Sequence, residues 1–126
     1  LVLCGILLYN IGKVKGINED FQADYTAKGR LMGHVALGLD ILGEAASSFK
    51  NFPEDILLKL KHVILSHDAG ENASALGAPR FPEAIFVNYM DAMDGRLNLM
   101  LDAINNDPNP DWTDNHNYFR SELYKK

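Results

Sequence analysis

The sequence predicts an all-α fold, and three observations lead to this prediction. Apolar residues recur at spacings of three and four along three long segments, which is the period of one face of a helix. Proline and acidic residues stand at the expected starts of two of these segments, where a helix accepts them best. No stretch alternates apolar and polar residues as a half-buried strand does. We therefore expect four main helices in one compact domain of 126 residues.

The first two helices are expected before residue 50. Residues 1–11 form an apolar run that predicts a buried helix ending near Gly12, and residues 12–25 are polar and predict a loop. Thr26 is a suitable N-cap for a helix over residues 27–49. The apolar face of this helix comprises Leu31, Val35, Leu39, Leu42 and Ala46. Glycine also interrupts the pattern, and we expect close helix packing at Gly33, Gly38 and Gly43.

The third helix is predicted within the sequence NFPEDILLKLKHVILSH. Pro53 suits a first helical turn, and the acidic pair that follows suits the positive end of the helix dipole. One face of this helix carries Ile56, Leu60, Val63 and His67. Residues 69–81 are rich in Gly, Ala, Asn and Pro and predict a loop.

The fourth helix is the longest and is expected over residues 82–106, opened by Pro82 and Glu83. Its core stripe is predicted to be Phe86, Met90, Met93, Leu97, Met100 and Ile104. A neighbouring face carries Asp91, Asp94 and Asn98 at helical spacing. The remaining tail is expected to pack back onto the helices through Trp112, Tyr118, Phe119 and Tyr124.

Composition limits the classes of function. The net charge of −5 makes the chain by itself a poor electrostatic partner for nucleic acid, although a local basic patch remains compatible with it. Its single cysteine, Cys4, excludes an internal disulfide and fits a reducing compartment, so we expect a cytoplasmic location. No stretch approaches the ~20 apolar residues that span a bilayer, and we expect no membrane partner.

Four polar positions are candidates for chemistry: His34, His67, Asp68 and Asp91. Each has an ordinary structural interpretation, because a lone histidine on an amphipathic helix often lies at the edge of the core and a lone aspartate is often solvated. Together they offer imidazole and carboxylate groups from different helices, a donor set that suits a divalent metal. His62 is expected to be structural and His116 to be exposed.

Several motifs follow one another in a recognisable order. They are IGKV (11–14), YTAKGRLMGHVALGLDIL (25–42), the segment ending in KHVILSHDAG (61–70), GAPRFPEA (77–84) and NYMDAMDGRLNLM (88–100). In this order the chain resembles the HD-domain phosphohydrolase superfamily. The resemblance is strongest to the HD domain of bacterial 3′–5′ exoribonucleases that carry an OB-fold upstream, and WTDNHNYFRSELYK (112–125) is similar to the ending of that family.

The resemblance implies an HD-domain-like helical bundle and a set of site residues. Metal ligands would be His34, His67, Asp68, Asp91 and Asn10, and Lys13 and Asp94 would take part in catalysis. The ion would be divalent: Mn, Fe, Ni, Zn or Mg. Tyr9 and Asn10 occupy the place of the His-Asp doublet, Asp68 replaces a histidine, and Asn88 stands where these exonucleases often have histidine. A phenol is a poor ligand and an amide oxygen carries no charge, so the site would be weakened or the metal lost.

Two functions follow from this resemblance. The first is a metal-dependent phosphohydrolase that acts on phosphodiester bonds of RNA, single-stranded nucleic acid or a nucleotide, with reduced or absent activity. The alternative is a catalytically silent helical domain that serves as a scaffold or interaction module. Because the chain begins within an apolar stretch, we also expect it to be a C-terminal piece of a longer protein that lacks the first helix and the OB-fold.

Overall fold

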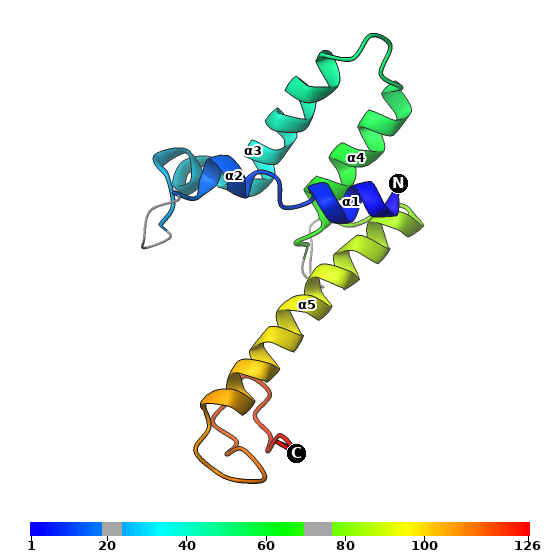
Figure 1. The fold of residues 1–126 in the computed structure, drawn as a ribbon. Coiled ribbons are helices and arrows are strands. Elements are labelled where there is room, and N and C mark those ends of the chain that lie inside the picture. The colour runs from blue at the N-terminus through cyan, green and yellow to red at the C-terminus, as the bar shows by residue number, and fades with distance from the viewer. Residues whose placement is uncertain (19–23, 70–76) are drawn as a thin grey trace. The chain divides into compact units, whose positions relative to one another are not determined.

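The computed structural model describes residues 1–18, 24–69 and 77–126 and confirms the all-α prediction (Figure 1). Its helices are α1 (Val2–Leu8), α2 (Lys13–Gly16), α3 (Ala27–Ser47), α4 (Glu54–Ser66) and α5 (Pro82–Asn106). Across the described residues, β-structure is limited to two isolated bridges, Ile17 to Tyr25 and Trp112 to Tyr124. The chain divides into two compact units, Leu1–Tyr89 and Met90–Lys126. None of the described helices has the length and apolar character needed to cross a bilayer.

The amino-terminal residues form two short helices where we expected one helix and a loop. α1 ends at Leu8, and α2 lies inside the expected loop, of which residues 19–23 fall outside the described part. The expected burial of the first helix is wrong for its outer face, because Leu3 and Leu7 are 70% and 71% exposed. Its inner face is buried at Gly5, where a β-carbon would lie 3.1 Å from methyl groups of both Val63 and Val87. The missing side chain therefore lets α1 lie close to α4 and α5.

α3 has the predicted cap but is not one continuous helix. The Thr26 hydroxyl oxygen accepts a hydrogen bond from the Gly29 N–H at 2.9 Å, as an N-cap does. At Gly33 the backbone is non-helical, with φ at 71°, a value that glycine adopts without steric cost. This kink changes which residues face inward, so Leu31 is 87% exposed although it belongs to the predicted apolar face. The expected close packing is confirmed at Gly38, where a β-carbon would lie 3.3 Å from Ile64. It is wrong at Gly33, where a β-carbon would meet nothing within 4 Å, and at Gly43, where the nearest atom would be the Lys61 Nζ at 3.9 Å.

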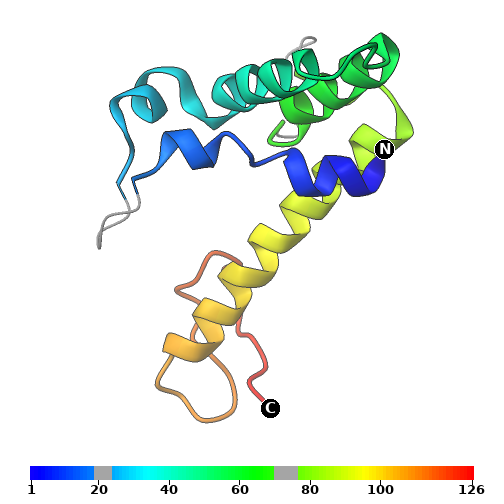
Figure 2. The same ribbon diagram turned by 45° about the horizontal axis from the view of Figure 1, so that its top comes forward.

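α3 and α4 run side by side and supply the main core of the first unit (Figure 1, Figure 2). The buried centre consists of Leu42, Leu60 and Ile64, and partly buried residues of α1, α3 and α4 surround it. A second cluster joins Val63 of α4 to Ala84 and Val87 of α5. The predicted inward face of α4 is confirmed, since Leu60, Val63 and His67 are all buried.

α5 has the predicted bounds but buries a different face. Its fully buried residues are Ala84 and Val87, whereas Phe86, Met93 and Leu97 of the predicted stripe are 49%, 48% and 51% exposed. α5 is apolar over much of its circumference, so spacing alone does not tell which side is covered. Ala84 and Val87 belong to the first unit and are buried there in one cluster with Val63 of α4. Of the loop expected over residues 69–81, residues 70–76 lie outside the described part.

The second unit consists of α5 from Met90 onward and an irregular tail held by hydrogen bonds. The Asp107 carboxylate accepts from the backbone N–H groups of Asn109 and Asp114 at 2.8 and 2.9 Å. These bonds, the Asp114 N–H first, together with the Lys125 ammonium, hold the pKa of Asp107 below its usual value. The buried residues of the tail are Thr113 and Leu123. The prediction that the tail packs through its aromatic residues is therefore wrong for Trp112, Tyr118 and Tyr124, which are exposed.

Candidate metal centre

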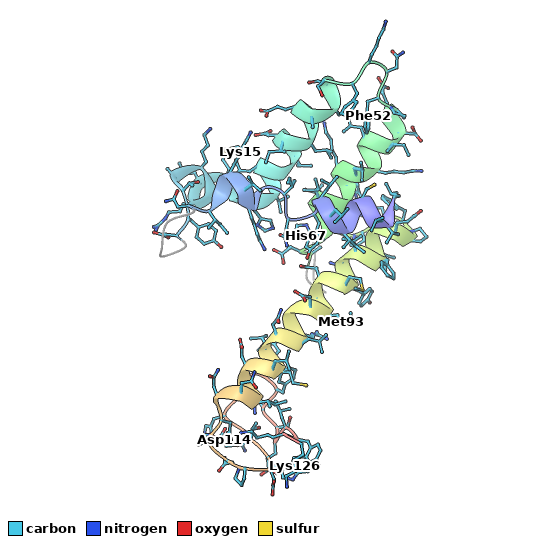
Figure 3. All side chains as sticks on the ribbon, viewed as in Figure 1. Lys15, Phe52, His67, Met93, Asp114 and Lys126 are labelled. Carbon is cyan, nitrogen blue, oxygen red and sulfur yellow. The ribbon has the colours of Figure 1, made fainter. Side chains whose placement is uncertain are left out.

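Two histidines from different helices meet in the first unit. His34 follows the Gly33 kink in α3, and His67 is the C-cap residue of α4, labelled in Figure 3. Their Nε2 atoms are 3.2 Å apart, and the ring planes are inclined at 66°. His67 is only 2% exposed and His34 is half-buried. Sequence analysis selected both residues, and the structure brings them together.

The backbone of α4 sets the tautomer of His67. Its Nδ1 lies 2.8 Å from the carbonyl oxygen of Ile64, which can only accept a hydrogen bond. The proton of a neutral His67 is therefore on Nδ1, and Nε2 directs its lone pair toward His34. Metal-binding histidines are oriented in this way, with the non-ligating nitrogen donating to a carbonyl or carboxylate.

The segment before α2 packs tightly against the backbone of His34. A β-carbon at Gly12 would lie 1.8 Å from the carbonyl oxygen of His34 and 2.6 Å from the amide nitrogen of Gly38. Only a residue without a side chain fits, and this fixes the path of the main chain that carries Tyr9 and Asn10. The ring of Tyr9 meets the ring of His67 edge-on, with centroids 4.9 Å apart.

Asn10 presents a polar atom whose hydrogen-bonding capacity is not used. Within the described part of the chain, its Oδ1 is buried without a hydrogen-bond partner. A buried acceptor left unpaired costs about 1–3 kcal/mol, so such atoms usually serve a ligand, an ion or water. Asn10 is one of the residues that the resemblance assigns to the metal, and this property fits that assignment.

Asn88 closes the end of α4, a role that sequence analysis missed. Its Nδ2 donates toward the carbonyl oxygens of Ser66, His67 and Ala69, at 3.2, 2.7 and 3.0 Å. The last carbonyl groups of a helix lack partners within the helix, and Asn88 supplies one from α5. Asn88 thus fixes the backbone of His67. No local sequence signal reports these contacts, because Asn88 lies 19 to 22 residues along the chain from the carbonyl groups that it binds.

Replacing Asn88 is expected to destabilise the first unit. Asn88→Ala leaves helix-end carbonyls unpaired and should lower the free energy of unfolding by about 1–3 kcal/mol. Asn88→Asp should cost more, because a carboxylate would face three carbonyl oxygens. Urea unfolding followed by circular dichroism measures both changes. Asn115→Asp, in an exposed part of the tail, adds the same charge and should be neutral; equal effects of the two Asp variants would contradict the proposed cap.

The other predicted site residues lie in different surroundings. Asp68 directly follows His67 and is exposed, and Lys13 is the exposed first residue of α2. Asp91 and Asp94 belong to the second unit, where Asp91 is half-buried and Asp94 is exposed. Within the described part of each unit, no three His, Cys, Asp or Glu side chains form a group that could hold an ion. The full ligand set therefore stays a prediction, and the histidine pair is what the structure places.

His62 has a structural contact, in line with the expectation from the sequence. Its Nε2 accepts a hydrogen bond from the backbone N–H of Arg80 at 3.0 Å, and its ring lies against Phe81. Partial burial, and secondly the charge of Arg80, lower the pKa of His62 below 6.5. Protonation of Nε2 would also remove the acceptor of this bond.

Acidification is therefore expected to destabilise the protein through His62. Below pH 6.5 the unfolded chain binds a proton that the folded chain resists, so stability falls until the lower folded pKa is passed. His62→Gln keeps an acceptor for the Arg80 N–H but does not titrate, so its urea midpoint should depend less on pH. His116→Gln, in the exposed tail, should keep the pH dependence of the parent. If His62→Gln also keeps it, this origin of the pH dependence is wrong.

Comparison with known proteins relates the sequence to a ribonuclease. The chain is 32% identical over 104 residues to the 3′-5′ exoribonuclease YhaM of Bacillus subtilis strain 168, a match covering 82% of this chain and 33% of that protein. The 3′-5′ exoribonuclease YhaM of Bacillus licheniformis is 28% identical over 131 residues, covering 99% of this chain and 41% of that protein. No family model matches the sequence, and no solved structure matches it significantly. The chain thus spans between a third and about two fifths of the length of these curated relatives, and its sequence is similar to part of a 3′–5′ exoribonuclease of the YhaM type.

Proposed function

We propose that the chain is part of a metal-dependent phosphohydrolase of the HD-domain type that cleaves phosphodiester bonds of RNA or single-stranded nucleic acid from the 3′ end, with weakened activity. The observation that carries this proposal is the histidine pair, whose Nε2 atoms approach to 3.2 Å with the tautomer of His67 fixed. Similarity to the two exoribonucleases supports the class of reaction and substrate.

The donor groups of the first unit fit a divalent cation. Two imidazole nitrogens that bind the same ion, each at about 2.0–2.1 Å, can lie at most about 4.2 Å apart. The Nε2 atoms of His34 and His67 are 3.2 Å apart and meet this limit. The unpaired Oδ1 of Asn10 offers a neutral oxygen. Asp68 and Asp91 complete the set by resemblance. Two imidazoles favour Zn, Fe or Ni over the harder Mg and Mn.

The chain's own residues have separate roles in this proposal. A divalent cation, when bound, would lower the pKa of water and stabilise negative charge on phosphoryl oxygens. Lys13 stands exposed at the start of α2, and within the described residues its ammonium group has no ion-pair partner, so it can contact a phosphate of the substrate. Asp94 lies one helical turn beyond Asp91 and serves as a second acidic group.

Tyr9 and Asn10 account for the weakening. The position of a ligand histidine is occupied by a phenol whose ring lies against His67, and the position of an aspartate by an amide. An amide oxygen lacks the charge with which a carboxylate binds a cation. Changes in groups that only support metal ligands already reduce affinity or activity about 10–100-fold, and changes in the ligands should cost more.

The decisive experiment measures metal binding and RNA shortening on the same protein. Calorimetric titration with Zn²⁺ should show one site per chain. A single-stranded RNA labelled at its 5′ end should be shortened slowly from its 3′ end, and a chelator should stop the reaction. Absence of both binding and shortening, with Zn²⁺, Mn²⁺ and Mg²⁺ each in excess, would overturn the proposal.

A second candidate is a catalytically silent scaffold. The edge-on contact of Tyr9 with His67 favours it, because the ring fills space beside a candidate ligand. This alternative predicts a folded chain that binds no metal. The titration above therefore decides between the two.

A further inference from the structure

Three aromatic side chains of the second unit are exposed to solvent. Trp112, Tyr118 and Tyr124 are 52%, 66% and 55% exposed. Backbone hydrogen bonds explain why Trp112 and Tyr124 are exposed. Thr113 N–H donates to the Leu123 carbonyl and Lys125 N–H to the Asp111 carbonyl, both at 3.0 Å, so that Trp112 and Tyr124 face each other across an antiparallel bridge. Their neighbours Thr113 and Leu123 point inward and are buried, which leaves the two rings on the outside.

These rings are held in place although the tail has no regular structure. The Trp112 and Tyr124 rings contact each other with centroids 5.0 Å apart. Tyr118 makes an edge contact with Phe119 at 5.3 Å. Asn117 Nδ2 donates to Thr113 Oγ1 at 3.4 Å and to the Ser121 carbonyl at 2.8 Å, which ties the turn carrying Tyr118 to the bridge carrying Trp112. Rigid aromatic groups bind a ligand at a low cost in conformational entropy.

One cation accompanies them in an unusual backbone conformation. Arg120 has φ at 52°, in the left-handed region that side chains other than Gly, Asn and Asp rarely adopt. Lys125 is engaged with Asp107 and Lys126 with Asp111. Arg120 is exposed, and no ion pair is formed by its guanidinium in the part of the chain that the structure describes. Residues in sparsely populated regions of φ and ψ occur preferentially at binding and active sites.

We propose that Trp112, Tyr118 and Tyr124 form an aromatic surface on which unpaired bases of single-stranded RNA stack, with Arg120 contacting one phosphate. The class of ligand rests on the proposed function. Aromatic rings bind bases of any sequence through their faces, and a nearby arginine adds a charge contact. Residues 90–126 contain seven acidic residues (Asp91, Asp94, Asp102, Asp107, Asp111, Asp114 and Glu122) against four basic ones (Arg96, Arg120, Lys125 and Lys126). Affinity at this surface therefore comes from stacking rather than from neutralised phosphates.

Trp112 is the only tryptophan of the chain, so its fluorescence reports on this surface directly. A short oligoadenylate is titrated into the protein with a chelator present, which removes any contribution from a metal. We expect saturable quenching by the single strand and much weaker quenching by an RNA duplex, whose bases are already stacked. One phosphate contact should give a slope of about −0.7 for log K against log salt concentration.

Substitutions locate the binding. Tyr124→Ala and Tyr118→Ala should each weaken binding about 5- to 100-fold, and Arg120→Ala should flatten the salt dependence. Tyr89→Ala removes an equally exposed ring from the first unit and should leave affinity unchanged. Thermal unfolding of each variant separates loss of binding from loss of folding. Unchanged Trp112 fluorescence with excess oligoadenylate, equal quenching by duplex, or a slope several-fold steeper would overturn the proposal.

The test also separates this inference from the proposed metal site. The titration contains a chelator and the aromatic residues belong to the second unit, so quenching does not depend on a metal bound by the histidine pair. Quenching without any metal binding would leave an RNA-binding surface on a silent domain. Metal binding without quenching would leave the proposed function intact and refute only the aromatic surface.

Discussion

Replacing His67 by alanine is expected to reduce Zn²⁺ affinity by more than about 100-fold and to remove any metal-dependent RNA shortening. The substitution deletes one of two nitrogens that lie 3.2 Å apart and leaves His34 without its neighbour. Loss of a group that merely supports a ligand costs about 10–100-fold, so loss of a ligand itself should exceed that range. Calorimetric titration of parent and variant with Zn²⁺ measures the change.

Two control variants separate loss of metal binding from loss of folding. His67 is nearly fully buried, and its removal leaves a cavity that lowers stability by itself. His34→Ala alters a half-buried residue and should cause a similar loss of affinity with less damage to the core. His116→Ala removes an exposed histidine of the tail and should bind metal as the parent does. If both His67→Ala and His34→Ala remain folded and bind Zn²⁺ normally, the histidine pair is not the metal site.

Gly12→Ala is expected to lower the free energy of unfolding of the first unit by about 2–4 kcal/mol. The new β-carbon would lie 1.8 Å from the His34 carbonyl oxygen and 2.6 Å from the Gly38 amide nitrogen. Both neighbours belong to the backbone of α3, so relief requires the helix to move. Inserting even one carbon into a well-packed site costs about 1–3 kcal/mol, and a clash with backbone lies at or above the upper end. Urea unfolding followed by circular dichroism measures the effect.

Gly43→Ala is the matched control for Gly12→Ala in the same unit. At Gly43 the nearest neighbour of a β-carbon would be the Lys61 Nζ at 3.9 Å, the mobile end of a long side chain. Alanine inside a helix is favoured over glycine by about 0.5–1 kcal/mol, so this variant should be as stable as the parent or more stable. If the two variants are equally stable, the close approach at Gly12 does not hold the unit together.

The sequence predicted the helices better than their inward faces. Thr26 caps α3 as predicted, because a side-chain cap acts locally, whereas Pro53 precedes α4 as its N-cap residue instead of lying in its first turn. The sequence does not tell whether a glycine marks a kink or a close approach between helices, because glycine permits both. Gly33 lies at a kink, whereas Gly38, five residues later, lies at a close approach. The buried face of α5 depends on which neighbour covers it, and spacing within one helix does not contain that information.

The same reasoning explains the candidate site. His34 and His67 were selected by residue type, and their proximity follows from the packing of α3 on α4. The Ile64 carbonyl that orients His67 lies in the last turn of α4. Because carbonyl groups at a helix end lack partners within the helix, this hydrogen bond could have been predicted from the sequence. The amide of Asn88 acts across more than 20 residues of sequence, and its contact emerges only in three dimensions.

The contact between Gly12 and the His34 carbonyl also bears on how this protein can change over evolutionary time. This close approach constrains the path of the main chain over residues 9–12, and it does not depend on the side chains of Tyr9 and Asn10. Substitutions at these two positions can therefore change the chemistry of the segment while its backbone stays in place. A lineage that retains Gly12 therefore keeps this backbone path whichever side chains stand at positions 9 and 10.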